Sequence, residues 1–322
     1  MTPVADPTLR LERSLVAERG GLIIGCDEVG RGALAGPVAV GVCVVEVKRS
    51  TRVPAGLRDS KMLSELRREQ LAPVAMSWGV AHAVGYASAA EIDEIGITAC
   101  LGLAGWRAMA ELALGGVDLG AATVVLDGHF DWLTRTFDSS IATMASFDSS
   151  GSAGGAGFGS GAGAAAVRSA SALAGLSALP MVRTRIKADR DCASVAAASV
   201  ISKVARDRMM IEHHDDFPDY GWARNKGYGS EEHRDAILTR GATDLHRHTW
   251  LSGILAGETA VALDGFEAVD EPDPVDAFVL SQASALSQAS GPSPVPTAGT
   301  AAASGAGDAA SAPRRMDDGS AA

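Results

Sequence analysis

The segment from Leu22 to Gly32, LIIGCDEVGRG, places two adjacent acids directly after a short apolar run. The run predicts a buried strand over residues 22–27, and the glycines that follow predict a tight turn. Adjacent carboxylates at the end of a buried strand raise each other's pKa, so holding Asp27 and Glu28 together costs free energy. A divalent cation removes that cost, because both charges attract it. The pair therefore indicates a metal site at a strand end.

Apolar patterns further along the chain predict an α/β domain with a mixed sheet. Four more strands are predicted, over residues 37–46, 79–87, 123–127 and 181–186. Long helices are expected over residues 90–114 and 191–212. A shorter helix should begin near Ser230, because Ser-x-Glu-Glu supplies a helix N-cap.

The 322-residue chain divides into an N-terminal extension (1–19), a main domain (20–256) and a tail (257–322). Within the domain, residues 146–178 are almost all Gly, Ser and Ala. They offer too little apolar surface to offset the entropy of ordering, so we predict a flexible surface insert. The tail is rich in Ala, Ser, Pro and acids; it is predicted to be disordered, and its partner is unknown.

The net charge of −11 argues only weakly against a nucleic-acid partner, because the charge is unevenly distributed. The tail holds ten acids and two bases, a net of −8, which leaves −3 for residues 1–256. The four cysteines lack metal-ligand spacing such as C-x-x-C and are expected to be reduced core residues. No signal peptide is evident, and no apolar run reaches the roughly 20 residues that a membrane span needs. We expect a cytoplasmic protein with no membrane contact.

Two further acids lie where predicted strands end. Asp127 closes the strand over residues 123–127 and precedes Gly128, and Asp189 lies between the last strand and the long helix. Asp127 could be only a turn former and Asp189 only a helix N-terminal acid, and spacing does not separate Asp189 from Asp191. If they converge, such carboxylates suit Mg²⁺ or Mn²⁺. Two such ions about 4 Å apart can activate a water and stabilise a leaving alkoxide.

Five sequence blocks, in order, resemble type 2 ribonuclease H (ribonuclease HII), a nuclease with an RNase H-like fold. The blocks are GCDEVGRGALAGPVAV (25–40), LRDSKMLS (57–64), LDGH (126–129), KADRDCASVAAASVISKVARDRMM (187–210) and NKGYGSEEH (225–233). The resemblance covers about residues 20–255. It implies a mixed central sheet flanked by helices, with a helical C-terminal portion, and it makes the main domain the catalytic domain.

The resemblance also implies which residues carry the chemistry. It assigns metal binding and catalysis to the acids of three blocks, which here are Asp27, Glu28, Asp127 and Asp189. It thereby selects Asp189 over Asp191.

For the substrate, the resemblance implies that the turn Gly30-Arg31-Gly32 reads the 2′-hydroxyl of a ribonucleotide through backbone groups. Tyr228 would pack on the sugar of the following deoxynucleotide. The candidates for contacts with the nucleic-acid backbone are Ser60, Lys61 and Lys187. Outside these assignments, we expect a solvated helix face formed by Lys203, Arg206 and Arg208. The family's late Arg-x-Ser-Phe pattern is RHTW here, from Arg247 to Trp250, which puts local packing in doubt.

The implied activity is an endonuclease that hydrolyses the RNA strand of RNA–DNA hybrids and nicks at single ribonucleotides embedded in duplex DNA. Two Mg²⁺ or Mn²⁺ ions would assist the hydrolysis and leave 3′-hydroxyl and 5′-phosphate ends. Such a nuclease would serve ribonucleotide excision in DNA replication and repair, and we expect a monomer. The alternatives are type 3 ribonuclease H, against which the GRG turn argues, and a catalytically inactive hybrid-binding module, against which the four acids argue.

Overall fold

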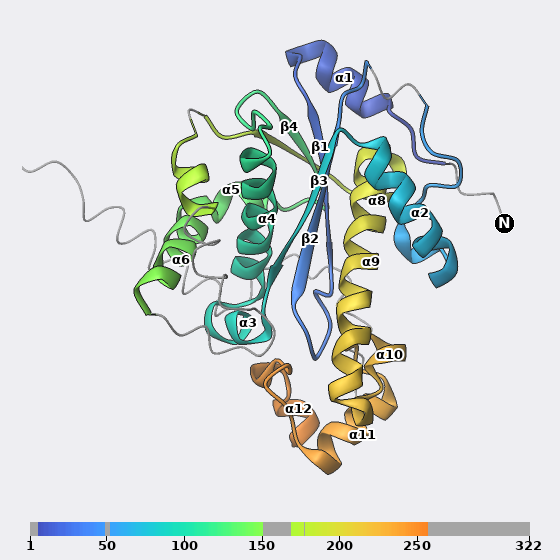
Figure 1. Ribbon diagram of the computed structural model, residues 1–322, viewed down its shortest axis with the longest axis vertical. Coiled ribbons are helices and arrows are strands. Elements are labelled where there is room, and N and C mark those ends of the chain that lie inside the picture. Colours follow the sequence, from blue (N-terminus) through green and yellow to red (C-terminus); the bar gives the residue numbers. More distant parts are fainter. Residues whose placement is uncertain (1–5, 49–51, 151–168, 177, 257–322) are drawn as a thin grey trace, which may run out of the picture. The chain divides into compact units, whose positions relative to one another are not determined.

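A five-stranded sheet forms the centre of the protein, as Figure 1 shows for the computed structural model. The structure describes residues 6–48, 52–150, 169–176 and 178–256, with only the backbone for 145–150. The tail predicted over residues 257–322 therefore lies outside the described residues. The strands are β1 (Ile23–Val29), β2 (Val38–Val45), β3 (Ala81–Ala87), β4 (Thr123–Asp127) and β5 (Met181–Arg185).

The sheet is mixed, as the sequence predicted. Its strand order is β3-β2-β1-β4-β5. The pairs β1–β2 and β2–β3 are antiparallel, whereas β1–β4 and β4–β5 are parallel. The carboxyl ends of β1, β4 and β5 therefore point the same way, which is where the acids Asp27 and Asp127 occur.

Helices cover both faces of the sheet (Figure 1). One face carries α3 (Ala89–Ile95), α4 (Ile97–Leu114), α5 (Trp132–Arg135) and α6 (Phe137–Ser150). The other carries α1 (Arg10–Arg19), α2 (Glu65–Trp78), α8 (Ala188–Asp191) and α9 (Ala193–Asp216). The helical C-terminal portion follows α9 and consists of α10 (Trp222–Asn225), α11 (Glu231–Arg240) and α12 (Ser252–Leu255). Short 3-10 turns lie at Ser60–Met62, Pro218–Tyr220 and His248–Trp250.

The helix predicted over residues 90–114 is divided in two at Gly96, whose φ of +80° a helix does not tolerate. Its second part, α4, is long and apolar enough to cross a membrane by length and composition alone. However, 61% of it is buried inside the structure, where Leu101, Leu103 and Trp106 pack in the core. We interpret α4 as the core helix of a folded domain.

Helix α9 packs unusually close to β1 and β2. A Cβ atom added to Gly25 would lie 2.1 Å from the carbonyl carbon of Ser194, and one added to Gly41 would lie 2.6 Å from the carbonyl oxygen of Ala198. Two glycines on neighbouring strands thus let the helix backbone approach the sheet. The polar side chains of α9 are thereby brought over the carboxyl end of β1.

The predicted extension contains a docked helix, and the prediction of a flexible insert is wrong at both ends of the insert. The supposed extension 1–19 contains α1, whose Leu15 packs on Ile23, while buried Glu12 accepts hydrogen bonds from the Ser194 amide and hydroxyl. The supposed insert 146–178 is helical at both ends, up to residue 150 and over residues 169–174, where Leu173 is in the core. Alanine favours helix, and a few apolar side chains suffice to dock a short one. Residues 151–168 lie outside the described residues.

Candidate active site

The acids at the ends of β1 and β4 lie next to each other. The parallel register pairs Cys26 with Leu126, and its next step brings Asp27 beside Asp127. Asp127 also connects to the third segment, because its Oδ1 accepts hydrogen bonds from the amides of Ala188 (2.6 Å) and Asp189 (3.4 Å). The carboxylate of β4 thus fixes the start of α8 and holds Asp189 near the strand ends.

Burial and mutual repulsion perturb these acids strongly. Asp27 and Asp189 are each only 8% exposed. Burial raises the pKa of Asp27 well above its ordinary value, and nearby negative charges add to this effect, those of Glu28, Asp127 and Asp189. Burial likewise raises the pKa of Asp189 to about 7, with the charges of Asp127 and Asp59 adding. Four carboxylates from three distant segments therefore share one electrostatic site.

Glu28 lies on the opposite side of the strand from Asp27, because successive strand side chains alternate. Burial raises the pKa of Glu28, and the charge of Arg31 opposes the rise. Arg31 approaches Glu28 at 4.0 Å. Glu28 thus links the acid cluster, which we define as Asp27, Glu28, Asp127 and Asp189, to the turn that follows β1.

The acid cluster fits a hard divalent cation in its chemistry. Carboxylate oxygens are the ligands that Mg²⁺ and Mn²⁺ prefer, and a cation would reverse the repulsion that raises these pKa values. Among the described residues, no group of three or more His, Cys, Asp or Glu side chains is already arranged to ligate an ion. One oxygen of Asp127 is bonded to the start of α8. Asp127 would therefore bind a cation while it also fixes the start of α8.

Ser60 and Lys61 lie beside the acid cluster. The hydroxyls of Ser199 on α9 and Ser60 are 2.9 Å apart, and a hydrogen bond from Ser199 opposes the rise in the pKa of Asp27. Burial lowers the pKa of the Lys61 ammonium, but four carboxylates outweigh this and raise it, those of Asp27, Asp59, Asp189 and Glu28. Lys61 is thus the cation that faces the cluster most directly.

The turn Gly30-Arg31-Gly32 is accessible and depends on glycine. Gly30 has φ +83°, and a Cβ atom there would lie 2.1 Å from Nε of Arg206. Gly32 is exposed, and a Cβ atom there would meet nothing within 4 Å. The backbone at Gly32 is therefore open to a ligand.

Tyr228 belongs to a loop attached to this turn. The carbonyl oxygen of Gly227 accepts hydrogen bonds from the amides of Leu34 (2.8 Å) and Ala35 (3.1 Å). The half-buried Tyr228 ring lies 5.4 Å from both the Lys203 ammonium and the Arg206 guanidinium carbon. The structure therefore places the two predicted ribonucleotide-reading elements side by side.

Two remaining candidates behave differently from each other. Lys187 is exposed and adopts a left-handed conformation (φ 62°) directly before α8, two residues before Asp189. Asp191 instead forms ion pairs with Arg185 (2.9 Å) and Arg190 (3.4 Å) at the surface. The structure thus separates Asp189 from Asp191, which spacing alone did not.

The expectation of a solvated helix face at Lys203, Arg206 and Arg208 is wrong for Arg206, which is fully buried. Lys203 is half-buried and pairs with Asp207 at 2.7 Å, and Arg208 is exposed and pairs with Glu69. Sequence reasoning also missed Ser199. The available signal was a row of serines, Ser194, Ser199 and Ser202, within the otherwise apolar face of α9.

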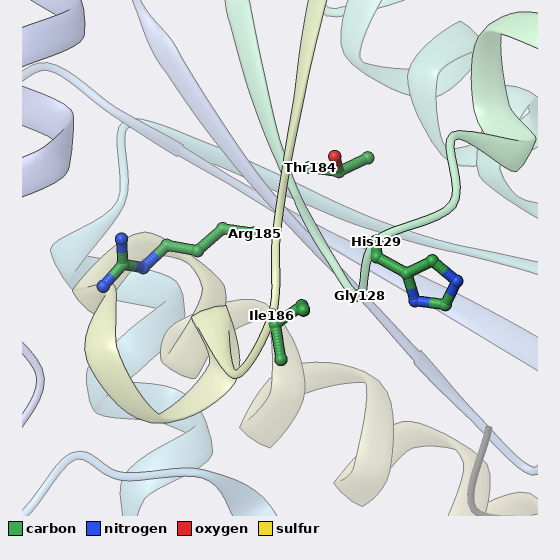
Figure 2. Close-up of a pocket in the computed structure, with 5 residues that line it drawn as sticks. All are labelled: Gly128, His129, Thr184, Arg185 and Ile186. Atoms are coloured by element: carbon green, nitrogen blue, oxygen red, sulfur yellow. The ribbon is translucent and has the colours of Figure 1, made fainter. Parts of the chain in front are cut away.

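An open pocket of about 460 Å³ lies past the end of β4. Figure 2 shows its lining residues, Gly128, His129, Thr184, Arg185 and Ile186. The Arg185 side chain extends away from His129 toward α8, where it meets Asp191 (Figure 2). None of the acid cluster lines this pocket, so it adjoins the candidate active site without containing it.

Comparison with known proteins agrees with this geometry. The family model for ribonuclease HII matches residues 24–119 and 137–252. The chain belongs to the ribonuclease HII family. Ribonuclease HII from Streptomyces griseus is 39% identical over 252 residues, covering 77% of this chain and 85% of the relative. That from Thermus thermophilus is 34% identical over 232 residues, covering 71% and 86%.

The fold has solved counterparts as well. Bst-RNase HIII in complex with Mn²⁺ is 22% identical, with a TM-score of 0.51 over 75% of this chain and 72% of that one. This likeness shows the RNase H-like fold. Membership of the ribonuclease HII family makes the chain a metal-dependent endoribonuclease that acts on RNA–DNA hybrids.

Proposed function

We propose that this ribonuclease HII family member nicks duplex DNA at single embedded ribonucleotides, in addition to cleaving longer hybrids, and that it does so with two divalent ions. The observation that carries the proposal is the junction of two features. The acid cluster, built from three segments, adjoins an exposed glycine turn whose neighbour is Tyr228. A site that joins hydrolytic chemistry to a 2′-hydroxyl reader suits excision of ribonucleotides during DNA replication and repair.

The residues divide the work of hydrolysis between them. Bound Mg²⁺ or Mn²⁺ would supply an activated water and stabilise the leaving 3′-oxygen. Asp27 and Asp127, adjacent on parallel strands, are suited to hold both ions. Glu28 and Asp189 approach from either side and would complete the coordination and orient the water. No side chain need attack the phosphorus. Because water would attack and the 3′-oxygen would leave, the products would carry 3′-hydroxyl and 5′-phosphate ends.

Selection of the ribonucleotide would come from the turn and from Tyr228. The exposed backbone at Gly32 can approach a 2′-hydroxyl closely, and that hydroxyl is the group that distinguishes RNA from DNA. Tyr228 would pack against the next sugar on the 3′ side. Lys61, Lys187 and Ser60 would contact the phosphates near the acid cluster.

The test is cleavage of a duplex that carries one ribonucleotide, with Mg²⁺ or Mn²⁺, by the wild type, Asp27→Asn and the control Asp219→Asn. Asp219 is an acid that pairs with Arg240 in the C-terminal portion. Loss of a metal ligand at Asp27 should reduce kcat at least about 100-fold without weakening hybrid binding, because the substitution also removes a negative charge. The Asp219→Asn variant should match the wild type.

Two results would contradict the proposal. The first is wild-type protein that binds this duplex but does not nick it with either metal. The second is an Asp27→Asn variant that cleaves as fast as the Asp219→Asn control. End-group analysis of the product should find 5′-phosphate, and a 2′,3′-cyclic phosphate would exclude water as the nucleophile.

A further inference from the structure

Two buried arginines lie directly beneath the ribonucleotide-reading turn. Arg206 on α9 and Arg247 near the C-terminus of the domain both have 0% exposure. The sequence does not indicate this arrangement, because Arg247 lies more than 200 residues after the turn. We refer to Arg206 and Arg247 as the arginine pair.

Arg247 fixes the backbone of the turn. Its guanidinium donates to the carbonyl oxygens of Gly30 (2.6 Å) and Arg31 (2.7 Å), and to that of Gly36 at 3.2 and 3.3 Å. The five N–H groups of a guanidinium form a rigid fork, which a lysine ammonium does not reproduce. One side chain thus sets the direction of two consecutive peptide groups in the Gly30-Arg31-Gly32 turn.

Arg206 joins the turn to the Tyr228 loop. It packs against Gly30 of the turn and donates to Ala35 (3.1 Å) and Pro37 (2.8 Å) in the segment that follows. It also donates to Lys226 (2.9 Å), two residues before Tyr228. The same guanidinium lies 5.4 Å from the Tyr228 ring. The distance between the turn and Tyr228 therefore depends on one planar group that contacts both.

Backbone carbonyls are the main partners of the arginine pair, while the charges of Asp207 and Asp93 act on it from beyond ion-pair distance. Among the described residues, no carboxylate lies within ion-pair distance of either guanidinium; backbone carbonyls take their place. Burial and the charge of Arg206 together lower the pKa of Arg247 to about 9. The Trp250 ring covers Arg247 at 4.9 Å, so the RHTW sequence packs well despite its departure from the family pattern.

Burying two like charges costs free energy, and the hydrogen bonds to backbone carbonyls offset part of that cost. Those same hydrogen bonds tie the arginine pair to the turn and to the Tyr228 loop. Positive charge beneath an exposed turn attracts phosphate. Because each peptide group is planar, holding the carbonyls of the turn also sets the direction of the amides that would face a ligand.

We propose that the arginine pair positions the ribonucleotide-reading elements: it sets the spacing between the Gly30-Arg31-Gly32 turn and Tyr228, and its charge attracts the phosphate at the junction between ribonucleotide and deoxyribonucleotide. This inference rests on the proposed nicking at single ribonucleotides. Arg206 and Arg247 act through the turn and Tyr228 and do not touch the reacting atoms.

The test compares Arg247→Lys and Arg247→Met on two substrates, a duplex with one ribonucleotide and a long RNA–DNA hybrid. Arg247→Lys keeps the charge and loses the fork, so kcat/KM at the single ribonucleotide should fall about 10-fold, through kcat. The enzyme can bind a long hybrid in many registers, so kcat/KM on that substrate should fall no more than about 3-fold. Arg247→Met loses the charge too, so its KM for the single-ribonucleotide duplex should also rise.

Arg107→Lys is the matched control. Arg107 also donates to a backbone carbonyl (Tyr86, 2.7 Å) and to a carboxylate (Glu91, 2.7 and 3.0 Å), on the other side of the sheet. The Arg107→Lys variant should have a lower melting temperature than the wild type but the same ratio of kcat/KM values on the two substrates. If Arg247→Met does not fold, Arg206→Met takes its place as the variant that removes a charge, with the same expected rise in KM. Arg206→Lys repeats the test of the fork, with the same expected change in the ratio of the two kcat/KM values.

If the arginine pair were merely structural, the activity on both substrates would fall equally, in proportion to the folded fraction measured by thermal melting. That result, or an unchanged ratio in Arg247→Lys and Arg206→Lys, would overturn the inference while leaving the nuclease intact. Failure of the proposed function itself would look different, because the wild type would then not nick the single-ribonucleotide duplex at all.

Discussion

Replacing Asp189 with asparagine should stabilise the metal-free protein while destroying its activity. Asp189 is 8% exposed, and burial together with the charges of Asp127 and Asp59 raises its pKa from 3.8 to about 7. In the unfolded chain the carboxyl ionises near its ordinary value. Ionising Asp189 thus costs more free energy in the folded protein than in the unfolded chain, so the ionised carboxylate destabilises the fold.

The sign and the size follow from linkage. A raised folded pKa contributes stability that is fully present below pH 3.8 and is lost as the pH rises through about 7. At about 1.4 kcal/mol per pH unit, the loss amounts to about 4 kcal/mol. The Asp189→Asn variant lacks this loss. At pH 7.5 its free energy of unfolding should therefore exceed that of the wild type by up to about 4 kcal/mol, and it should unfold at a higher urea concentration.

Urea denaturation in EDTA at pH 4.5, 6.0 and 7.5 measures the difference, and Asp191→Asn is the matched control. Asp191 is on the same helix but is exposed and pairs with Arg185 and Arg190. Its replacement should cost no more than about 1 kcal/mol. The reasoning is refuted if Asp189→Asn is less stable than the wild type at pH 7.5, or if its advantage does not grow from pH 4.5 to pH 7.5.

Two further predictions concern the loop that carries Tyr228. Tyr228→Ala should reduce cleavage at single ribonucleotides about 10-fold and affect long hybrids less, as measured by kcat/KM, since it removes a sugar-packing surface; equal losses on both would argue against junction reading. Below this loop, His233 hydrogen-bonds the Tyr228 carbonyl (2.9 Å), and its other nitrogen meets His246 at 3.1 Å. Burial and the charge of His233 lower the pKa of His246 to about 4, so about 3 kcal/mol of stability present above pH 6.5 should be lost as the pH falls to about 4. The variant His246→Gln should lose less on acidification in the same urea assay, and an identical pH dependence would contradict this.

The strands were predictable because their signals are local. β1, β2 and β4 are short, mostly apolar runs, and β1 through β5 begin and end within two residues of expectation. The family resemblance identified the acid cluster, which residue spacing alone left open at Asp189 and Asp191. The structure then gave a physical reason, since Asp191 is occupied by surface arginines.

The failures came from contacts made at long range. Arg206 resembles any charged residue on a helix, and only the fold reveals that its partners are carbonyls about 170 residues earlier in the chain. The helix over residues 10–19 escaped notice because its apolar side is narrow and depends on docking against β1. The helical ends of the Gly/Ser/Ala segment were not predicted, because its composition alone suggests a flexible chain. Alanine nevertheless favours helix, and Leu173 supplies the apolar side chain that packs in the core.

The central claim is that carboxylates from three distant segments close around shared divalent ions. A crystal of the protein soaked in Mn²⁺, measured for anomalous scattering, tests this most directly. We expect two peaks with carboxylate oxygens about 2–2.5 Å away, drawn from Asp27, Glu28, Asp127 and Asp189. Peaks located elsewhere, or an Asp189 carboxylate that stays outside coordination distance with hybrid bound, would contradict the account.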